Sequence, residues 1–104
     1  MSDVSSIGPT LDGLFEVLEA RGRELPEGSY TTELLSGPQE KLLKKIAEEA
    51  GEVIIAARDC DSGTGDVAAL RYEIADLVYH LLVVMVREGL TLDDLAAELD
   101  SRRK

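Results

Sequence analysis

Two short acidic runs hold the side chains of this sequence that are best placed to do chemistry together. The first spans residues 48–52 and reads EEAGE, and the second spans residues 73–76 and reads EIAD. Residues three apart lie on one face of a helix, so each run sets two carboxylates side by side. Four converging carboxylates would repel one another unless a cation lay among them. The spacing therefore predicts a metal site formed by Glu49, Glu52, Glu73 and Asp76.

Carboxylate oxygens are the ligands that hard cations such as Mg²⁺ prefer, with water or substrate phosphates in the remaining positions. Mn²⁺ is a possible substitute. A single pair is weak evidence, because solvated helices often carry one, but two pairs on consecutive helices favour a metal site. A di-iron bundle would need Glu-x-x-His pairs, and the one histidine, His80, lies four residues after Asp76. A lone histidine of this kind is more often packed or hydrogen-bonded than a ligand.

Basic and hydroxyl side chains near the first run are candidates for binding phosphate or a base. Lys45 precedes the run by one turn and Lys41 by two turns, so they could pair with its glutamates or hold phosphate. The segment 24–38 carries three adjacent hydroxyl groups, those of Ser29, Tyr30 and Thr31. These hydroxyls could bind phosphate oxygens, although helix caps and turns are an equally good explanation of the same residues.

The elements that must position these side chains predict an all-α fold. Apolar residues at helical spacing predict helices over residues 10–23, 39–59 and 67–87, and a fourth helix that begins at Thr91. Thr91 and Asp94 have the spacing of a capping box, and Gly89 suits a helix end.

Loops and turns complete this four-helix arrangement. The short turn at residues 61–66 makes the two long central helices antiparallel neighbours. Residues 1–9 are expected to form a flexible arm, and residues 24–38 a mostly irregular connection in which some helix begins near Thr32. Residues 10–104 are expected to form one domain, since 104 residues suit a single core.

Apolar faces on the two central helices indicate where the core lies. On the first, the expected face is Leu42, Ile46, Ala50, Val53 and Ala57, flanked by Leu43 and Ile54. On the second, it is Leu70, Ile74, Leu77, Leu81 and Val84. Residues 81–86 are apolar all round, and a small four-helix monomer could not bury them on every side. This segment predicts a homodimer or larger assembly that completes the bundle.

Gly51 interrupts the first central helix and costs about 1 kcal/mol relative to alanine. It marks either a close approach by another backbone or ligand, or a tolerated surface position.

Composition excludes several partners. A net charge of −10 disfavours nucleic acid and anionic membranes, because both would repel the protein. No apolar stretch reaches the roughly 18 residues of a membrane helix. A single cysteine, Cys60, suits a reducing cytoplasm, and residues 1–8 do not resemble a signal peptide.

The acidic runs also resemble the signature of a known family. Glu48-Glu49-x-x-Glu52 followed by Glu73-x-x-Asp76 is similar to the motif of the all-α, MazG-like nucleoside triphosphate pyrophosphohydrolases. Within that group the resemblance is greatest to the phosphoribosyl-ATP pyrophosphatases of histidine biosynthesis, and it covers about residues 11–99. The narrower match rests on the SYT sequence at residues 29–31, on Lys41 and Lys45, and on DLVYHLL at residues 76–82.

This resemblance implies a Mg²⁺-dependent cytoplasmic enzyme that hydrolyses 1-(5-phosphoribosyl)-ATP to the AMP form and pyrophosphate. It implies a dimeric helical bundle with the site near the subunit interface. Glu49, Glu52, Glu73 and Asp76 would be the metal ligands, and Glu48 a further ligand or a base that orients water. Lys41 and Lys45 would contact phosphates, and Tyr79 and His80 would shape the site.

The residue inventory is consistent with this chemistry. Phosphoryl transfer depends on positioning and charge neutralisation, which metal ions supply while activating water. Cys60 has no paired histidine and the serines lie in turns, so direct attack by water is the simplest hypothesis. Two alternatives remain. One is a related enzyme acting on free or damaged nucleoside triphosphates, and the other is a non-catalytic helical adaptor whose carboxylates are merely solvated.

Overall fold

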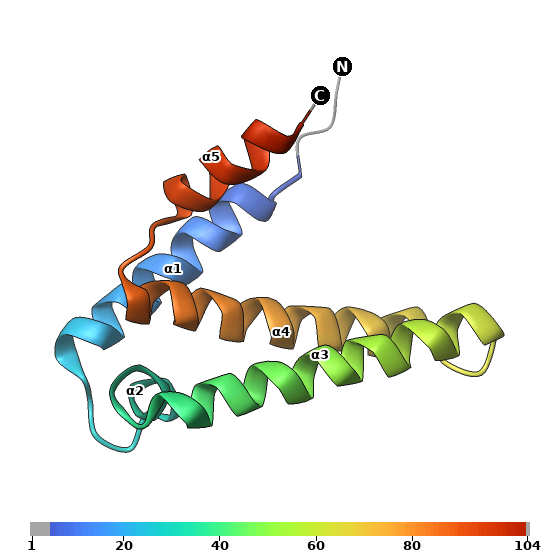
Figure 1. Ribbon diagram of the computed structural model, residues 1–104, viewed down its shortest axis with the longest axis horizontal. Coiled ribbons are helices and arrows are strands. Elements are labelled where there is room, and N and C mark those ends of the chain that lie inside the picture. The colour runs from blue at the N-terminus through green and yellow to red at the C-terminus, as the bar shows by residue number, and fades with distance from the viewer. Residues whose placement is uncertain (1–4, 104) are drawn as a thin grey trace.

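The computed structural model describes residues 5–103, and within that range the protein is built from helices without a strand. The helices are α1 (Ile7–Glu24), α2 (Tyr30–Ser36), α3 (Gln39–Ser62), α4 (Val67–Glu88) and α5 (Leu92–Arg102). The predicted all-α class is confirmed, and so are the two long antiparallel helices, α3 and α4 (Figure 1). The four-helix prediction did not count α2 as a separate helix, although some helix was expected near Thr32, two residues after the start of α2 at Tyr30. None of the described helices is long and apolar enough to cross a membrane.

Two helix boundaries differ from the expected ones. Helix α1 begins at Ile7, three residues early, because Pro9 falls in its first turn, where a backbone N–H has no partner within the helix. Residues 7–9 are therefore helical, and residues 1–4 of the expected arm lie outside the described part of the chain. Helix α3 runs on to Ser62 and ends at Gly63, whose φ of 81° is readily adopted by glycine.

Local capping signals fix the other ends as expected. Gly89 ends α4 with a φ of 78°. Thr91 and Asp94 form the predicted capping box at the start of α5: the Asp94 N–H donates to Thr91 Oγ1, and the Thr91 N–H donates to Asp94 Oδ2. Asp66 caps α4 in a similar way by accepting a hydrogen bond from the Ala69 N–H at 2.7 Å.

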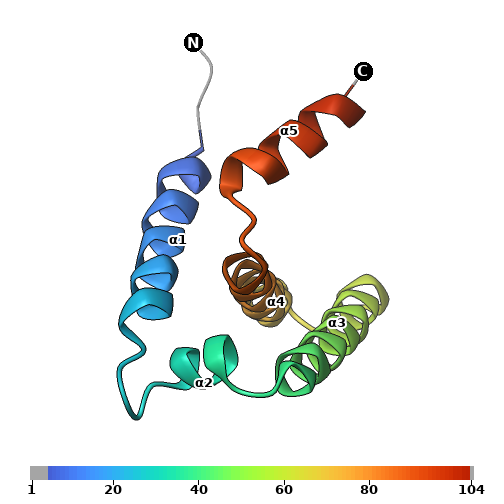
Figure 2. The ribbon, with the colours of Figure 1, turned by 60° about the vertical axis from the view of Figure 1, so that its left-hand side comes forward.

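Helix α4 is the centre of the molecule. It packs along α3, and α1 and α2 also contact it, so that it is surrounded by three helices (Figure 2). The buried apolar core joins these elements and consists of Phe15, Leu18, Leu34, Leu42, Leu82 and Val83. Two contacts place α1 and α2 against the C-terminal half of α4: a Cβ at Gly22 would lie 3.6 Å from Val86, and Arg87 donates to the Leu34 carbonyl at 2.8 Å.

The buried side of the central helices differs from the expected one. Ile74 and Leu81 were expected in the core but are 45% and 44% exposed, whereas Leu82 and Val83 are buried. The reason is that helices approach α4 from several sides, and periodicity within an all-apolar segment does not say which side is covered. On α3, Leu42 is buried as expected. Its expected flanking residues, Leu43 and Ile54, are largely exposed.

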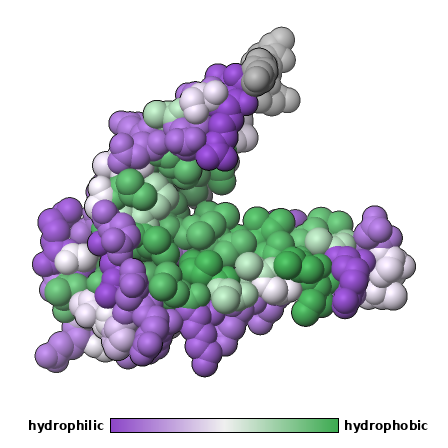
Figure 3. Space-filling model, viewed as in Figure 1, coloured by the Kyte–Doolittle hydropathy of each residue, from purple (hydrophilic) through white to green (hydrophobic). Residues whose placement is uncertain are grey.

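The far end of the α3–α4 pair projects away from the other helices (Figure 1). Apolar side chains cover a broad surface of this pair (Figure 3). The large exposed apolar residues of the two helices are Leu43, Ile54, Ile55, Val67, Tyr72, Ile74 and Leu81. An apolar surface of this kind is unusual for a protein that works as a single chain.

Candidate active site

Three of the four predicted metal ligands come together where α3 faces α4. Glu49, Glu52 and Glu73 each offer a carboxylate oxygen, and these oxygens lie within 4.8 Å of one another. The antiparallel packing of α3 and α4 explains the convergence, because each run presents its carboxylates to the facing helix. Asp76 lies one turn after Glu73 on α4 and is close enough to Glu49 to raise the pKa of that carboxyl. We call these four residues the acidic cluster.

The carboxylates of the acidic cluster are not satisfied by the protein alone. Glu49 is only 3% exposed. Its Oε2 and the Oε1 of Glu73 are both buried, and neither has a hydrogen-bond partner among residues 5–103. A buried charged oxygen without a partner is strongly unfavourable, so the two oxygens need a proton or a cation. The donor set is all oxygen, which fits Mg²⁺ or Mn²⁺.

The pKa shifts in the cluster agree with a need for a proton or a cation. Burial raises the pKa of Glu49, and the neighbouring carboxyl group of Asp76 raises it further, although Lys45 acts in the opposite direction. Burial likewise raises the pKa of Glu73, as does a hydrogen bond with Glu52. Like charges held close together resist ionisation, so in the absence of a cation the cluster retains protons more readily than isolated carboxylates do.

The other charged candidates lie around the cluster in different ways. Lys45 forms an ion pair with Glu49 at 3.3 Å, one turn along α3. Lys41 instead pairs with Glu33 of α2 at 3.6 Å, and both of these side chains are largely exposed. Glu48 is exposed, next to Glu49 in the chain but outside the group of converging oxygens. The structure thus places Lys45 at the cluster and Lys41 at the α2–α3 contact.

The SYT segment forms the start of α2, which the sequence prediction treated mostly as an irregular connection. Ser29 is its N-cap and accepts a hydrogen bond from the Thr32 N–H at 3.2 Å. Tyr30 and Thr31 reach α4: the Tyr30 hydroxyl lies 3.0 Å from His80 Nε2, and the Thr31 hydroxyl is hydrogen-bonded to that of Tyr79. All three hydroxyls therefore have partners within the protein, and the cap explanation is correct for Ser29.

Two contacts that hold α2 in place involve residues outside the predicted site. Arg87 donates to the Leu34 carbonyl at 2.8 Å and ties α2 to α4, and Glu33 holds Lys41. A usable signal for α2 was present: the N-cap Ser29 is followed by the apolar pair at residues 34–35, which packs against the core.

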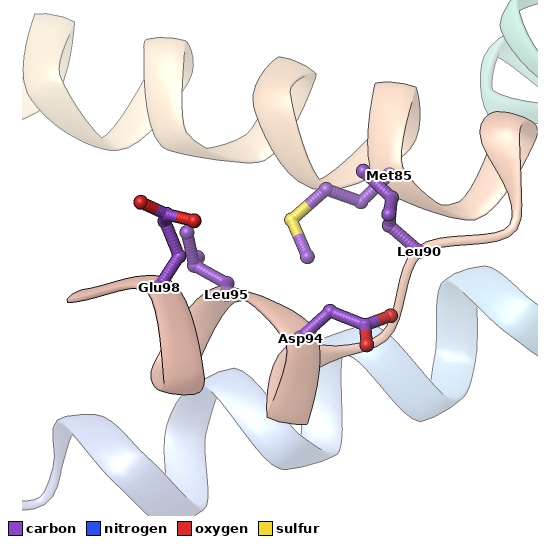
Figure 4. A pocket seen from close by; sticks show the side chains of 5 residues that line it. All are labelled: Met85, Leu90, Asp94, Leu95 and Glu98. Carbon is purple, nitrogen blue, oxygen red and sulfur yellow. The ribbon is translucent and has the colours of Figure 1, made fainter. Parts of the chain in front are cut away.

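A groove of about 440 Å³ lies elsewhere, between the end of α4 and α5. Figure 4 shows its lining side chains, Met85, Leu90, Asp94, Leu95 and Glu98. None of these residues belongs to the acidic cluster, so the groove does not mark the site. The chemistry of the oxygens, rather than concavity, identifies the candidate active site.

Comparison with known proteins agrees with the residue pattern. The profile of a family described as phosphoribosyl-ATP pyrophosphohydrolase matches residues 11–103. A phosphoribosyl-ATP pyrophosphatase of Pelotomaculum thermopropionicum is 50% identical over 91 residues, covering 88% of each chain. A protein of the same name from Haloquadratum walsbyi is 44% identical over 104 residues, covering 98% of this chain and 99% of the relative.

A third relative has a different architecture. The histidine biosynthesis bifunctional protein of Halalkalibacterium halodurans is 43% identical over 103 residues, which cover 99% of this chain but only 45% of that protein. The predicted resemblance is confirmed by these matches. The chain belongs to the phosphoribosyl-ATP pyrophosphohydrolase family.

Proposed function

We propose that the protein hydrolyses 1-(5-phosphoribosyl)-ATP to 1-(5-phosphoribosyl)-AMP and pyrophosphate, the second step of histidine biosynthesis, with Mg²⁺ as the cation. Membership of the family and the printed names of the relatives support the substrate. The observation that carries the proposed chemistry is the acidic cluster. Glu49 and Glu73 bring buried, unpartnered oxygens from α3 and α4 to one place.

Glu49, Glu52, Glu73 and Asp76 would hold the cation, and Mn²⁺ would be an acceptable substitute. A bound cation neutralises charge on the phosphate oxygens and activates water. Lys45, fixed beside Glu49, adds positive charge at the edge of the cluster and is the better placed of the two lysines to contact a phosphate. Lys41 would reach a phosphate only by leaving Glu33.

Water attack on a phosphorus atom also needs a proton acceptor. A carboxylate is the kind of group in this cluster that can accept a proton from water. Glu48, which is exposed and precedes Glu49 in the chain, is a second candidate for this task. Tyr79 and His80 shape the neighbouring wall through their contacts with α2.

We further propose that two chains associate through the apolar surface of the α3–α4 pair. Ile74 and Leu81 of α4 and Ile54 of α3 are large apolar residues left exposed in one chain. Their burial between two copies would place the subunit interface beside the acidic cluster, since Ile74 directly follows Glu73. We place this homodimer in the cytoplasm and treat residues 10–104 as its pyrophosphohydrolase domain.

The test is release of pyrophosphate from a substrate panel, with Mg²⁺, with Mn²⁺ and with a chelator. We expect turnover of 1-(5-phosphoribosyl)-ATP, dependent on the cation, and little turnover of the common dNTPs. A strong preference for any dNTP would move the protein to the related triphosphate hydrolases, and absence of all turnover would favour the adaptor alternative. Glu73→Gln should abolish turnover, whereas Glu19→Gln, an exposed position on α1, should leave it intact.

A further inference from the structure

His80 of α4 is buried, at 3% exposed, and both of its ring nitrogens have partners. Nδ1 lies 2.8 Å from the Asp76 carbonyl oxygen, and Nε2 lies 3.0 Å from the Tyr30 hydroxyl. A carbonyl oxygen can only accept, so Nδ1 must carry the proton. In the neutral ring, which carries one proton on its two nitrogens, Nε2 is then an acceptor. The Tyr30 hydroxyl must therefore donate its proton to His80.

This arrangement decides what the Tyr30 hydroxyl can still do. A phenol has one proton, and when that proton is used, the oxygen can only accept further hydrogen bonds. The start of α2 cannot easily turn away, because the neighbouring Thr31 is bonded to Tyr79 and the Leu34 carbonyl is held by Arg87. Tyr30 itself remains 44% exposed, so a ligand can reach it.

The pKa of Tyr30 is influenced by charged residues of the site. Burial raises the pKa of Tyr30, and the charge of Lys45 lowers it, while Tyr79, Asp76 and Glu49 raise it further. The same Lys45 and Glu49 form the ion pair at the edge of the acidic cluster. Geometry connects the hydroxyl to the site through His80, which contacts Tyr30 at 3.0 Å and the backbone carbonyl of Asp76, a residue of the acidic cluster, at 2.8 Å.

We infer that His80 is a positioning residue that makes Tyr30 a fixed hydrogen-bond acceptor beside the acidic cluster. Phosphate oxygens are acceptors and cannot bond to it, whereas the hydroxyl and amino groups of a nucleoside are donors. Tyr30 thus receives a donor of the sugar or base, and not a phosphate oxygen. The nucleotide part of this inference depends on the proposed function, but the tautomer of His80 does not.

The tautomer can be measured directly, because His80 is the one histidine of the chain. Nitrogen-15 NMR of the labelled, cation-free protein at pH 8 should show a proton on Nδ1 and none on Nε2. In Tyr30→Phe the proton should stay on Nδ1 while the Nε2 resonance shifts, because that nitrogen loses its donor. A proton on Nε2, or a doubly protonated ring, in the wild-type protein would overturn the inference whatever the enzyme hydrolyses.

Kinetics test the ligand part. Tyr30→Phe should raise KM for 1-(5-phosphoribosyl)-ATP by about three- to tenfold, the effect of one lost hydrogen bond, with kcat within about twofold. Inhibition by pyrophosphate should not change, because that ligand offers only phosphate oxygens. Glu19→Gln, at an exposed position of α1 outside the α3–α4 pair, is the control and should behave as wild type.

Weaker pyrophosphate inhibition in Tyr30→Phe, in parallel with the higher KM, would show that Tyr30 binds phosphate and would overturn the inference. An unchanged KM would do the same. If the wild-type protein hydrolysed none of the nucleotides, the proposed function and the ligand part would fail together, and the NMR result would still decide the role of His80.

Discussion

Glu49 of α3 and Glu73 of α4 offer oxygens within 4.8 Å of each other, and each also has a buried oxygen without a hydrogen-bond partner. Such a pair is unfavourable in a protein that has only its own side chains to offer. The two carboxylates repel each other where the two longest helices, α3 and α4, pack together. This repulsion should make the stability of the protein depend on divalent cations and on pH.

Divalent cations should raise the melting temperature of the wild-type protein. A ligand that binds only the folded state stabilises it by about 2.7 kcal/mol at a concentration one hundred times its Kd. Glu49→Gln should largely lose this response, because it removes a charged oxygen from the centre of the cluster. Differential scanning fluorimetry with Mg²⁺, Mn²⁺ and a chelator measures the effect.

The control for the cation experiment is Glu19→Gln, which removes one negative charge from an exposed position on α1. It should respond to Mg²⁺ as the wild-type protein does. If both variants lost the response equally, the cation would be acting on net charge and not on the acidic cluster. If the wild-type protein did not respond, the carboxylates would be solvated groups, as the adaptor alternative holds.

The cation-free protein should become less stable as pH rises from about 5 to 8. The pKa values of Glu49 and Glu73 are raised, mainly by burial, so the folded state holds protons that the unfolded state has released. Stability from this source is fully present below the ordinary glutamate pKa of about 4.3 and is lost as pH rises through the raised values. Urea unfolding in the presence of a chelator measures the trend.

The ionisation of Asp94 sets the lower limit of the pH range that this experiment can use. The pKa of Asp94 is lowered, chiefly by its hydrogen bond with the Thr91 backbone, so its contribution is lost only in more acidic solution. The range from pH 5 to 8 avoids that effect. In Glu49→Gln the dependence on pH should be shallower than in Glu19→Gln. Equal slopes in the two variants would contradict the assignment of the effect to the cluster.

Substituting Gly51 by alanine should stabilise the protein by roughly 0.5–1 kcal/mol, because glycine is unfavourable inside a helix. Beyond the adjacent backbone of α3, an added Cβ at Gly51 would meet no atom of residues 5–103 within 4 Å, so no other described segment of the chain makes the close approach considered from the sequence. Gly13→Ala of α1, also in open space, should behave in the same way.

A negative control for the glycine substitutions is Gly37→Ala, which would put a Cβ 2.5 Å from the Glu33 carbonyl oxygen and should destabilise the fold. Thermal unfolding of the three variants provides the comparison. Loss of stability in Gly51→Ala, or loss of turnover at unchanged stability, would mean that a second chain or a ligand approaches this position.

Features that depend on spacing within one helix, or on one short turn, could be predicted from the sequence. They are the capping box of α5 at Thr91, the end of α4 at Gly89 and the approach of the two acidic runs to each other. Helix α2 was missed because its seven residues lie between Gly and Pro residues, and its stability comes from Tyr79, His80 and Arg87 of a distant helix.

The buried side of α4 could not be inferred for a related reason. Residues 81–86 are all apolar, so the pattern holds no information about direction, and three helices from elsewhere in the chain decide which residues they cover. Leu82 and Val83 face those helices, and Leu81 does not. The tautomer of His80 likewise depends on a partner fifty residues away in the chain, Tyr30.

Leu81 offers the sharpest test of the proposed dimer. It is 44% exposed on α4, although its neighbours Leu82 and Val83 form part of the core. If two chains bury this surface, Leu81→Glu places a charge in the interface without a partner, which is strongly unfavourable. We expect the wild-type protein to have the mass of two chains in sedimentation velocity, and Leu81→Glu to dissociate at micromolar concentration.

The matched control is Val17→Glu, at a position on α1 that is 48% exposed and lies outside the α3–α4 pair. It should remain dimeric, and circular dichroism should show that both variants keep their helices. A monomeric wild-type protein, or equal dissociation of both variants, would contradict the proposed interface. If Leu81→Glu stays folded but loses turnover on dissociation, while Val17→Glu keeps both, turnover depends on the association of two chains.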